Sequence, residues 1–248
     1  MEEKKIYSRP KSLRDVTMSY CPGCGHSTVH KLIAEVVDEL GIREKMVGVA
    51  PVGCAVFAYD FWDFDVTEAP HGRTPVVATA IKRVLPENIV FSYQGDGDLA
   101  SIGMAETLHT ANRGENITVI FINNANYGMT GGQLAPTTLI GQQTTTSPMG
   151  RDAANYGYPI KVAELLSQLE GVKYLERVKV TDAPSTIKAK KAIKKAFLNQ
   201  INKVGYSFVE VLSSCPTNWG MEPTESNKWI DEKMQEYFPI GKIKDVEK

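Results

Sequence analysis

Two apolar segments that each end in a polar turn constrain the fold of this chain more than any other feature. Residues 89–93 lead into Gly-Asp-Gly at 95–97, and residues 117–122 lead into two asparagines at 123–124. Such apolar runs are typical of buried parallel strands, and the 25 residues between Gly97 and Asn123 suffice for one helix and one returning strand. We therefore predict a βαβ unit in an α/β fold, a mostly parallel sheet flanked by helices. Its polar turns would lie at the carboxyl ends of the strands, where open α/β sheets bind ligands.

The side chains at these strand ends predict a magnesium–diphosphate site. Mg²⁺ prefers oxygen ligands and fills the rest of its shell with phosphate and water. Asp96 would supply a carboxylate, Asn124 an amide oxygen and Asn126 a backbone carbonyl. Gly95 and Gly97 have no Cβ, so the main chain there can approach a phosphate closely. Gly-Asp-Gly alone is as typical of a simple turn, but the asparagines at this spacing favour the cation site.

Composition bounds the class of protein. The 248 residues carry a formal net charge of −1 with acidic and basic residues interspersed, which excludes the large basic surface of a nucleic-acid-binding or membrane-surface protein. No apolar run has the length of a membrane span, and no apolar region of a secretion signal follows the N-terminus. We expect a soluble cytoplasmic protein with an N-terminal arm at 1–19, which is poorly ordered or lies on a partner. A cofactor-binding domain at 20–220 and a tail at 221–248 that packs on a partner subunit would follow.

Four cysteines, Cys21, Cys24, Cys54 and Cys215, are poor disulfide candidates in that compartment. A lone cysteine is most often an inert core residue, but the Cys-Pro-Gly-Cys pair suits a metal or a redox couple. Structural zinc sites usually combine two close pairs, whereas iron–sulfur clusters need four thiolates and tolerate distant ones. The spacing alone leaves zinc and a cluster equally open.

Segments around these motifs allow further expectations. A strand at 46–52 would place Gly53, Cys54 and Ala55 at the same sheet edge as Asp96. His71-Gly72-Arg73 precedes a helix, which suits either an anionic ligand or an ordinary solvated helix start. The helix after Cys24 should carry His26 and His30 as helix-start and surface residues. Residues 134–151 lack periodicity, and so long a loop would cover the site or bind a partner subunit.

Two extended motifs resemble those of a known family. Gly-Asp-Gly followed by Asn-Asn is similar to the thiamine diphosphate motif shared by transketolases, decarboxylases and 2-oxoacid oxidoreductases. Gly-Asp-Gly-Asp at 95–98 and Tyr-Gly-Met-Thr-Gly-Gly-Gln at 127–133 resemble, more narrowly, the β subunit of 2-oxoacid:ferredoxin oxidoreductases, over about residues 20–219. The resemblance implies the thiamine diphosphate-binding (PP-type) fold.

The resemblance also implies the site residues. Cys21, Cys24, Cys54 and Cys215 match the family's ligands to a [4Fe–4S] cluster, and Asp96, Asn124 and Asn126 would hold Mg²⁺. His71 would lie near the diphosphate, while the role of Arg73 stays open. The expected cofactor contacts are Gly53, Cys54, Ala55, His71, Gly95, Asp96, Gly97, Asp98, Asn124, Asn126, Gly128, Met129 and Thr130.

The activity implied is the oxidative decarboxylation of a 2-oxoacid to an acyl-coenzyme A and CO₂, with electrons passed through the cluster to ferredoxin. The motifs at 130–133 and 144–148 favour 2-oxoisovalerate slightly over 2-oxoglutarate. Such an enzyme is oxygen-sensitive and active only with an α subunit that carries the pyrimidine-binding domain, with or without γ and δ subunits. The alternatives are a subunit of a non-oxidative thiamine-dependent decarboxylase and a zinc-stabilised, non-enzymatic assembly protein.

Overall fold

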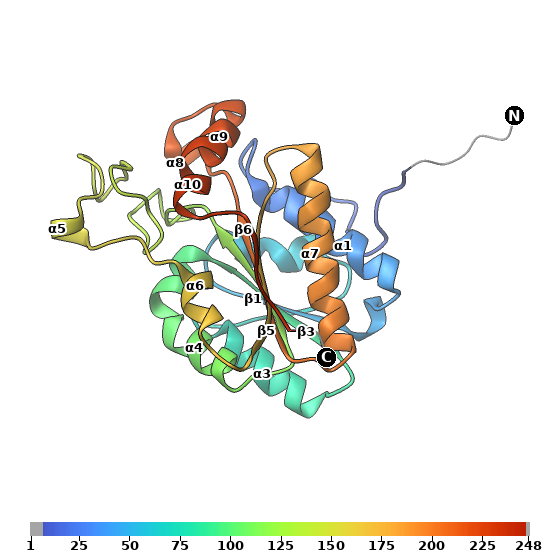
Figure 1. Cartoon of the computed structure of the whole chain (residues 1–248). Helices are drawn as coiled ribbons and strands as arrows, with labels where there is room; N and C mark the ends of the chain where they lie inside the picture. The colour runs from blue at the N-terminus through green and yellow to red at the C-terminus, as the bar shows by residue number, and fades with distance from the viewer. Residues whose placement is uncertain (1–6, 247–248) are drawn as a thin grey trace, which may run out of the picture.

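The computed structural model describes residues 7–246, which form one seven-stranded sheet with helices on both faces. The strand order is β2-β1-β3-β4-β6-β5-β7, in which neighbouring strands are parallel except that β7 runs antiparallel to β5 (Figure 1). The predicted fold class is thereby confirmed. The strands are β1 (Met46–Ala50), β2 (Asp65–Glu68), β3 (Ile89–Gly95), β4 (Thr118–Asn123), β5 (Val172–Lys179), β6 (Tyr206–Leu212) and β7 (Gly241–Asp245).

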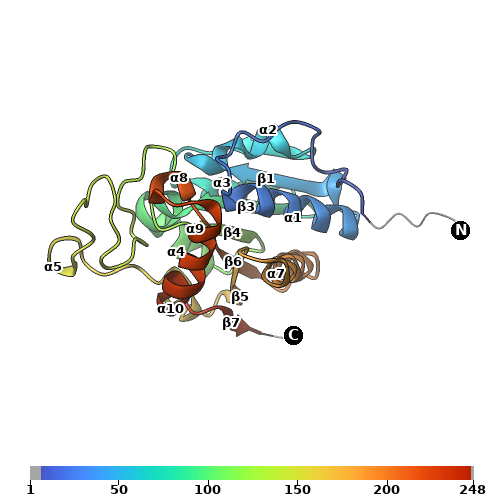
Figure 2. The same ribbon diagram turned by 90° about the horizontal axis from the view of Figure 1, so that it is seen from above.

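Helices cover the two faces of the sheet unequally. Helices α1 and α7 pack on one face and α3, α4 and α6 on the other, so the sheet is the middle layer of three (Figure 2). The helices longer than four residues are α1 (Gly25–Leu40), α3 (Thr74–Val84), η3 (Asp98–Ile102), α4 (Met104–Asn112), α6 (Val162–Ser167), α7 (Ala183–Ile201), α9 (Pro223–Trp229) and η4 (Ile230–Met234). The shorter ones are η1 (Arg43–Lys45), η2 (Cys54–Phe57), α2 (Ala58–Phe61), α5 (Ala153–Tyr156), α8 (Pro216–Trp219) and α10 (Gln235–Tyr237).

The central strands β3, β4 and β6 are mostly apolar and buried along nearly their whole length, because both of their faces are covered. On β3, Phe91 and Tyr93 face α1 and α7, whereas Val90 belongs to the core on the opposite face. All six residues of β4 are buried. No helix among the described residues has the length and apolar character needed to cross a membrane.

The described part of the N-terminal arm lies on its own chain. Leu13 pairs with Trp62 in an isolated antiparallel bridge, and the backbone N–H groups of Lys11 and Ser12 donate to the Asp38 carboxylate on α1. These contacts fix residues 11–13 against α1. The prediction for residues 1–6 falls outside the described part of the chain.

The C-terminal segment also returns to its own chain. Strand β7 adds to the edge of the sheet at β5, and Ile230, Met234 and Phe238 are buried against Leu212 at the end of β6. The inner face of the segment expected to pack on a partner subunit is therefore already used. Contact with a partner stays a prediction for its outer face, and residues 247–248 lie outside the described part.

The long loop after β4 is irregular, as predicted, but it is not loose. Between residues 134 and 151 it contains turns and isolated bridges only. Arg151, which is 4% exposed, closes it because its guanidinium group donates to several backbone carbonyls. The acceptors are the carbonyls of Ala135, Pro136, Thr138, Tyr156, Gly157 and Tyr158.

Candidate functional site

The predicted ligands meet at one edge of the sheet because four parallel strands end there. Strand β1 runs towards Cys54, β3 towards Asp96, β4 towards Asn124 and β6 towards Cys215. The register places Gly95 opposite Ile122 and Asn123 opposite Leu212, so β3, β4 and β6 end at nearly the same level of the sheet. Residues far apart in sequence are thereby brought together.

A pocket lies at this edge, and it contains nearly all of the predicted cofactor contacts. Of the thirteen residues expected, twelve line it, and Asp96 lies buried beneath it. The sequence interpretation missed His26, Val52 and Tyr127. The lining residues are His26, Val52, Gly53, Cys54, Ala55, His71, Gly95, Gly97, Asp98, Asn124, Asn126, Tyr127, Gly128, Met129 and Thr130.

Asp96 is the buried carboxylate of the site. It is 2% exposed, and burial raises its pKa to about 7 against hydrogen bonds that lower it. Its Oδ1 accepts from the backbone N–H of Gly97 at 2.9 Å, and its Oδ2 accepts from the hydroxyl of Thr137 at 2.6 Å. Thr137 belongs to the loop at 134–151, so this loop packs against the Asp96 carboxylate.

The oxygen atoms around Asn124 fit a magnesium ion. One terminal atom of its side-chain amide lies 3.1 Å from Asp96 Oδ1 and 2.8 Å from the backbone oxygen of Asn126. Neighbouring ligands around octahedral Mg²⁺ are about 2.9 Å apart, because each lies about 2.0–2.1 Å from the ion. Without a cation, the amide nitrogen of Asn124 occupies this position and donates hydrogen bonds to both oxygens. Rotation of the amide group by half a turn places its oxygen there instead, and the three oxygens could then bind a cation. The donor set of one carboxylate, one amide and one carbonyl suits Mg²⁺.

The turn between these ligands is strained and firmly held. Ala125 is fully buried and has a φ of 55°, a conformation that residues with a Cβ rarely adopt. Its carbonyl accepts from the hydroxyl of Thr138 at 2.7 Å, and its N–H donates to Asn123 Oδ1 at 3.2 Å. The side chain of Asn123 in turn donates to Glu210 on β6. Such strain persists where surrounding contacts determine the backbone, as they do at binding sites.

His71 enters the pocket with its orientation fixed by Asp98. Its Nδ1 is hydrogen-bonded to Asp98 Oδ1, which also accepts from the N–H of Gly72 at 2.7 Å, while Gln94 donates to Asp98 Oδ2 at 2.7 Å. Both oxygens of Asp98 are thus turned towards protein donors, and the pocket receives the imidazole. Arg73 forms a surface ion pair with Glu106.

The four cysteines are all free thiols gathered beside the pocket. Burial, together with the charges of the other cysteines, raises the pKa of Cys24 to about 12 and that of Cys54 to about 11. Gly128 leaves the space between two of the thiols. A Cβ there would lie 3.2 Å from Cys54 Sγ and 3.8 Å from Cys215 Sγ.

This arrangement fits a cluster better than a single ion. Within residues 7–246, no three Cys, His, Asp or Glu side chains converge closely enough to hold one metal ion. A zinc site requires that convergence, whereas each cysteine of a four-iron cluster binds a different iron. The raised pKa values mean that ionisation of these thiols is unfavourable without a nearby positive charge, which either kind of metal centre would supply.

His26 lies in the first turn of α1, as expected, but the expectation of surface histidines on this helix is wrong. His26 is 2% exposed and His30 is fully buried, in an aromatic cluster with Tyr20, Trp62 and Tyr93. Their spacing explains this, because positions 26, 30, 33 and 37 lie on one helix face, which also carries the buried Ile33 and Val37. His26 Nδ1 is hydrogen-bonded to the hydroxyl of Tyr93 at 2.6 Å.

Comparison with known proteins decides the family. Residues 52–211 match the model of the family "Thiamine pyrophosphate enzyme, C-terminal TPP binding domain". The 2-oxoglutarate synthase subunit KorB of Archaeoglobus fulgidus is 35% identical over 216 residues, which cover 87% of this chain and 76% of that protein. The chain belongs to the 2-oxoacid oxidoreductase family of thiamine pyrophosphate enzymes.

Other relatives agree with this family. The ketoisovalerate oxidoreductase subunit VorA of Methanothermobacter marburgensis is 48% identical over 98% of this chain, and the chain spans about half of that relative, 53% of its length. A solved 2-oxoglutarate:ferredoxin oxidoreductase from Magnetococcus marinus matches with a TM-score of 0.73 and 28% identity, covering 86% of this chain and 70% of that one.

Proposed function

We propose that this member of the 2-oxoacid oxidoreductase family is a β subunit that binds thiamine diphosphate, Mg²⁺ and a [4Fe–4S] cluster. Its assembled enzyme would convert a 2-oxoacid and coenzyme A to an acyl-coenzyme A and CO₂, with ferredoxin as the electron acceptor. One observation carries the proposal: the oxygen ligands around Asp96 and the thiols around Cys215 lie against the same pocket. A site that only bound a diphosphate would not need those thiols.

The chain's own residues would bind and orient the cofactor. Asp96, Asn124 and Asn126 would hold Mg²⁺ and through it the diphosphate, while the backbone at Gly95 and Gly97 would approach the phosphates. His71, held by Asp98, would place its imidazole ring against the diphosphate. Thr137 would keep water away from the buried carboxylate. When bound, thiamine diphosphate supplies an electron sink for the carbanion left by decarboxylation.

The four cysteines would hold the cluster at the edge of the same pocket. Cys54 lines the pocket and is also one of the four clustered cysteines. The distance for electron transfer from the thiamine cofactor to the cluster would therefore be short. The cluster would pass electrons to ferredoxin one at a time.

We propose 2-oxoisovalerate as the substrate. The VorA relative, named for ketoisovalerate, is 48% identical, and the KorB relative, named for 2-oxoglutarate, is 35% identical. Charge supports the same choice. Among the described residues that line the pocket there is no Lys or Arg that could pair with the second carboxylate of 2-oxoglutarate, whereas Met129 suits a branched apolar chain.

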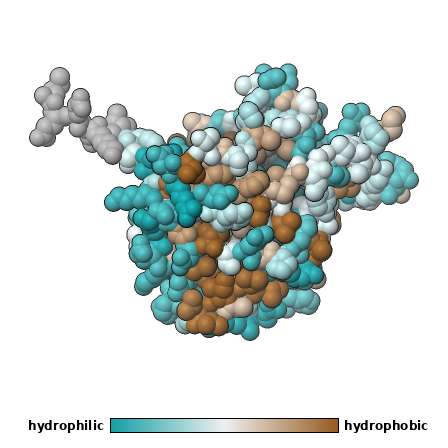
Figure 3. Space-filling model, turned by 180° about the vertical axis from the view of Figure 1, so that it is seen from behind, coloured by the Kyte–Doolittle hydropathy of each residue, from teal (hydrophilic) through white to brown (hydrophobic). Residues whose placement is uncertain are grey.

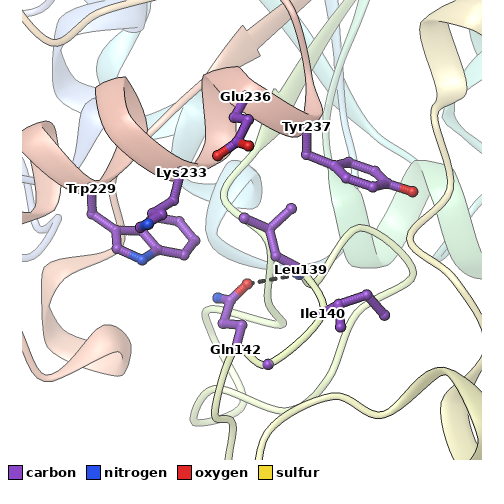
Figure 4. A pocket seen from close by; sticks show the side chains of 8 residues that line it. Leu139, Ile140, Gln142, Trp229, Lys233, Glu236 and Tyr237 are labelled. Atoms are coloured by element: carbon purple, nitrogen blue, oxygen red, sulfur yellow. Dashed lines mark hydrogen bonds between the residues drawn. The ribbon is translucent and has the colours of Figure 1, made fainter.

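A partner subunit would complete the site. The cavity measures about 130 Å³, below the roughly 300–1,000 Å³ of complete small-molecule sites, so a second surface is expected to close over the cofactor. The hollow in Figure 4 offers a docking position. It lies between Leu139, Ile140 and Gln142 of the long loop and the side chains of the C-terminal helices, has a volume of about 560 Å³ and is flanked by Lys233 and Glu236.

Metal analysis of anaerobically purified protein tests the proposal. We expect about four iron and four acid-labile sulfide per chain, with thiamine diphosphate binding that requires Mg²⁺. Cofactor binding without iron would indicate a non-oxidative decarboxylase subunit instead. Zinc without cofactor binding would indicate an assembly protein.

A further inference from the structure

Amide N–H donors lie beside the sulfur of Cys215. The side-chain amide of Asn218 donates from Nδ2 to Cys215 Sγ at 3.4 Å. The side chain of Asn126 is a second donor near the same sulfur. The sulfur expected to bind the cluster therefore faces neutral N–H groups of its own chain.

The amide of Asn218 is held in place independently of the thiol. Its Nδ2 also donates to the backbone oxygen of Gly128 at 2.7 Å, and Gly128 lies between the sulfurs of Cys54 and Cys215. A Cβ at Gly132 would lie 3.0 Å from Asn218 Cβ, so the side chain is wedged against the loop that follows β4. The donor is thus oriented before any cofactor binds.

An N–H group directed at a ligand sulfur changes the redox chemistry of an iron–sulfur cluster. Reduction adds negative charge, part of which resides on the thiolates, and an N–H dipole stabilises that charge. Hydrogen bonds to the sulfurs accordingly shift the reduction potential of a cluster to more positive values. We propose that Asn218 is a positioning residue that raises the reduction potential of the cluster through Cys215; this inference rests on the proposed function. A higher potential favours electron uptake from the thiamine site.

Asn218 is a better position for a test than Asn126. Asn126 also belongs to the predicted magnesium site, so a substitution there would disturb both cofactors. Asn218 does not line the cofactor pocket. Its neighbour Thr217 is exposed on the same short helix, α8, and provides a matched control.

The experiment is a redox titration of the anaerobically purified chain with its cluster, followed by electron paramagnetic resonance. Asn218→Leu keeps a branched side chain of similar size without an N–H, and Asn218→Asp keeps the shape but adds negative charge. We expect the midpoint potential to fall by about 59 mV in Asn218→Leu, a tenfold change in the one-electron equilibrium constant, and further in Asn218→Asp. Thr217→Val should titrate like the unmodified chain.

Iron and sulfide contents measured on the same samples separate the possible failures. An unchanged midpoint potential in Asn218→Asp with a full cluster would overturn the inference. This holds even if Asn218→Leu loses its cluster and cannot be titrated. A fall in both variants that Thr217→Val does not share supports it. Absence of iron and sulfide from the unmodified chain contradicts the proposed function instead.

Discussion

At the scale of single residues, Asp96 combines burial with a proposed role as a Mg²⁺ ligand, which requires charge. Its carboxylate is 2% exposed and its pKa is raised to about 7 by burial, so ionisation is costly unless a cation lies beside it. Asn124 supplies only a neutral oxygen, which water can replace. The two ligands should therefore differ in how much they contribute to cofactor binding.

We predict that Asp96→Ala abolishes Mg²⁺-dependent binding of thiamine diphosphate, whereas Asn124→Ala weakens it less. Loss of groups that only support a metal ligand typically costs 10–100-fold in affinity, so loss of this carboxylate should cost at least about 100-fold. Calorimetric titration measures both variants. Unchanged affinity in Asp96→Ala would mean that the site is misplaced.

His30 makes stability depend on pH. Burial, and then the charge of His26, lowers its pKa well below 6.5, and it faces Tyr20, Tyr93 and Trp62. The unfolded chain therefore gains a proton below pH 6.5 that the folded chain cannot accept, so stability is lost as the pH falls through this range. His26, whose pKa is lowered to about 4 by burial, acts in the same direction.

We predict that His30→Phe reduces this loss on the acid side. Each buried neutral histidine contributes a slope of up to about 1.4 kcal/mol per pH unit, and the variant removes one of the two. Urea denaturation at several pH values between about 5 and 8 gives the slopes. Equal slopes in the two proteins would exclude His30 as a source of the dependence.

The sequence identified most residues of the site because they follow strands, and strand ends are readable from apolar runs. It missed Thr137 and His26, although both reach the site. Thr137 hydrogen-bonds Asp96 across 41 positions of sequence from within an irregular loop, and no local pattern indicates such a contact. His26 lies at the helix start, as expected, but its position in the helical repeat places its side chain inside.

At the scale of elements, the predicted strands and helices agree with the structure where burial is strong, and the misses are at the sheet edges. Strand β2 has four mostly exposed residues, and β7, Gly241–Asp245, has lysines at two of its five positions. Neither carries an apolar run or a clean alternation. Both add to the sheet through backbone hydrogen bonds, which leave no signature in side-chain pattern.

One buried side chain, Arg151, makes six of the hydrogen bonds that shape the loop at 134–151. Arg151 serves six carbonyls, and Lys could not replace it because an ammonium group lacks the planar fork of five donors. We predict that Arg151→Lys and Arg151→Met destabilise the chain towards the upper end of the common range of about 0.5–3 kcal/mol. Faster proteolysis within the loop should accompany this change.

Limited proteolysis and chemical denaturation of both variants test this prediction. Met149→Ala is the matched control, since Met149 lies in the same loop and is 93% exposed. An unaltered cleavage pattern in Arg151→Met would show that other contacts hold the loop.

At the scale of the whole molecule, exposed apolar groups lie on the segment where a second protein is expected and on one further face. Ile140 and Tyr158, which are 48% and 74% exposed, belong to the segment that projects beyond the sheet in Figure 1. A separate apolar area is visible from behind in Figure 3, at the level of α3, where Val84 is 78% exposed. Contiguous apolar surface of this kind marks protein interfaces.

The last prediction is that this chain has no turnover without a partner. The pocket contains one carboxylate, Asp98, whose two oxygens are already bonded to His71, Gly72 and Gln94, and Asp96 beneath it is the proposed magnesium ligand. No carboxylate of the described lining is left to activate the aminopyrimidine ring of thiamine diphosphate, so another surface must supply it.

With cofactor, Mg²⁺, coenzyme A and 2-oxoisovalerate, the chain alone should not reduce ferredoxin or viologen, and adding the α subunit should restore reduction. Tyr158→Asp in the projecting segment should impair this reconstitution, whereas Lys188→Glu on the exposed face of α7 should not. Robust turnover by the isolated chain would rule out the subunit assignment.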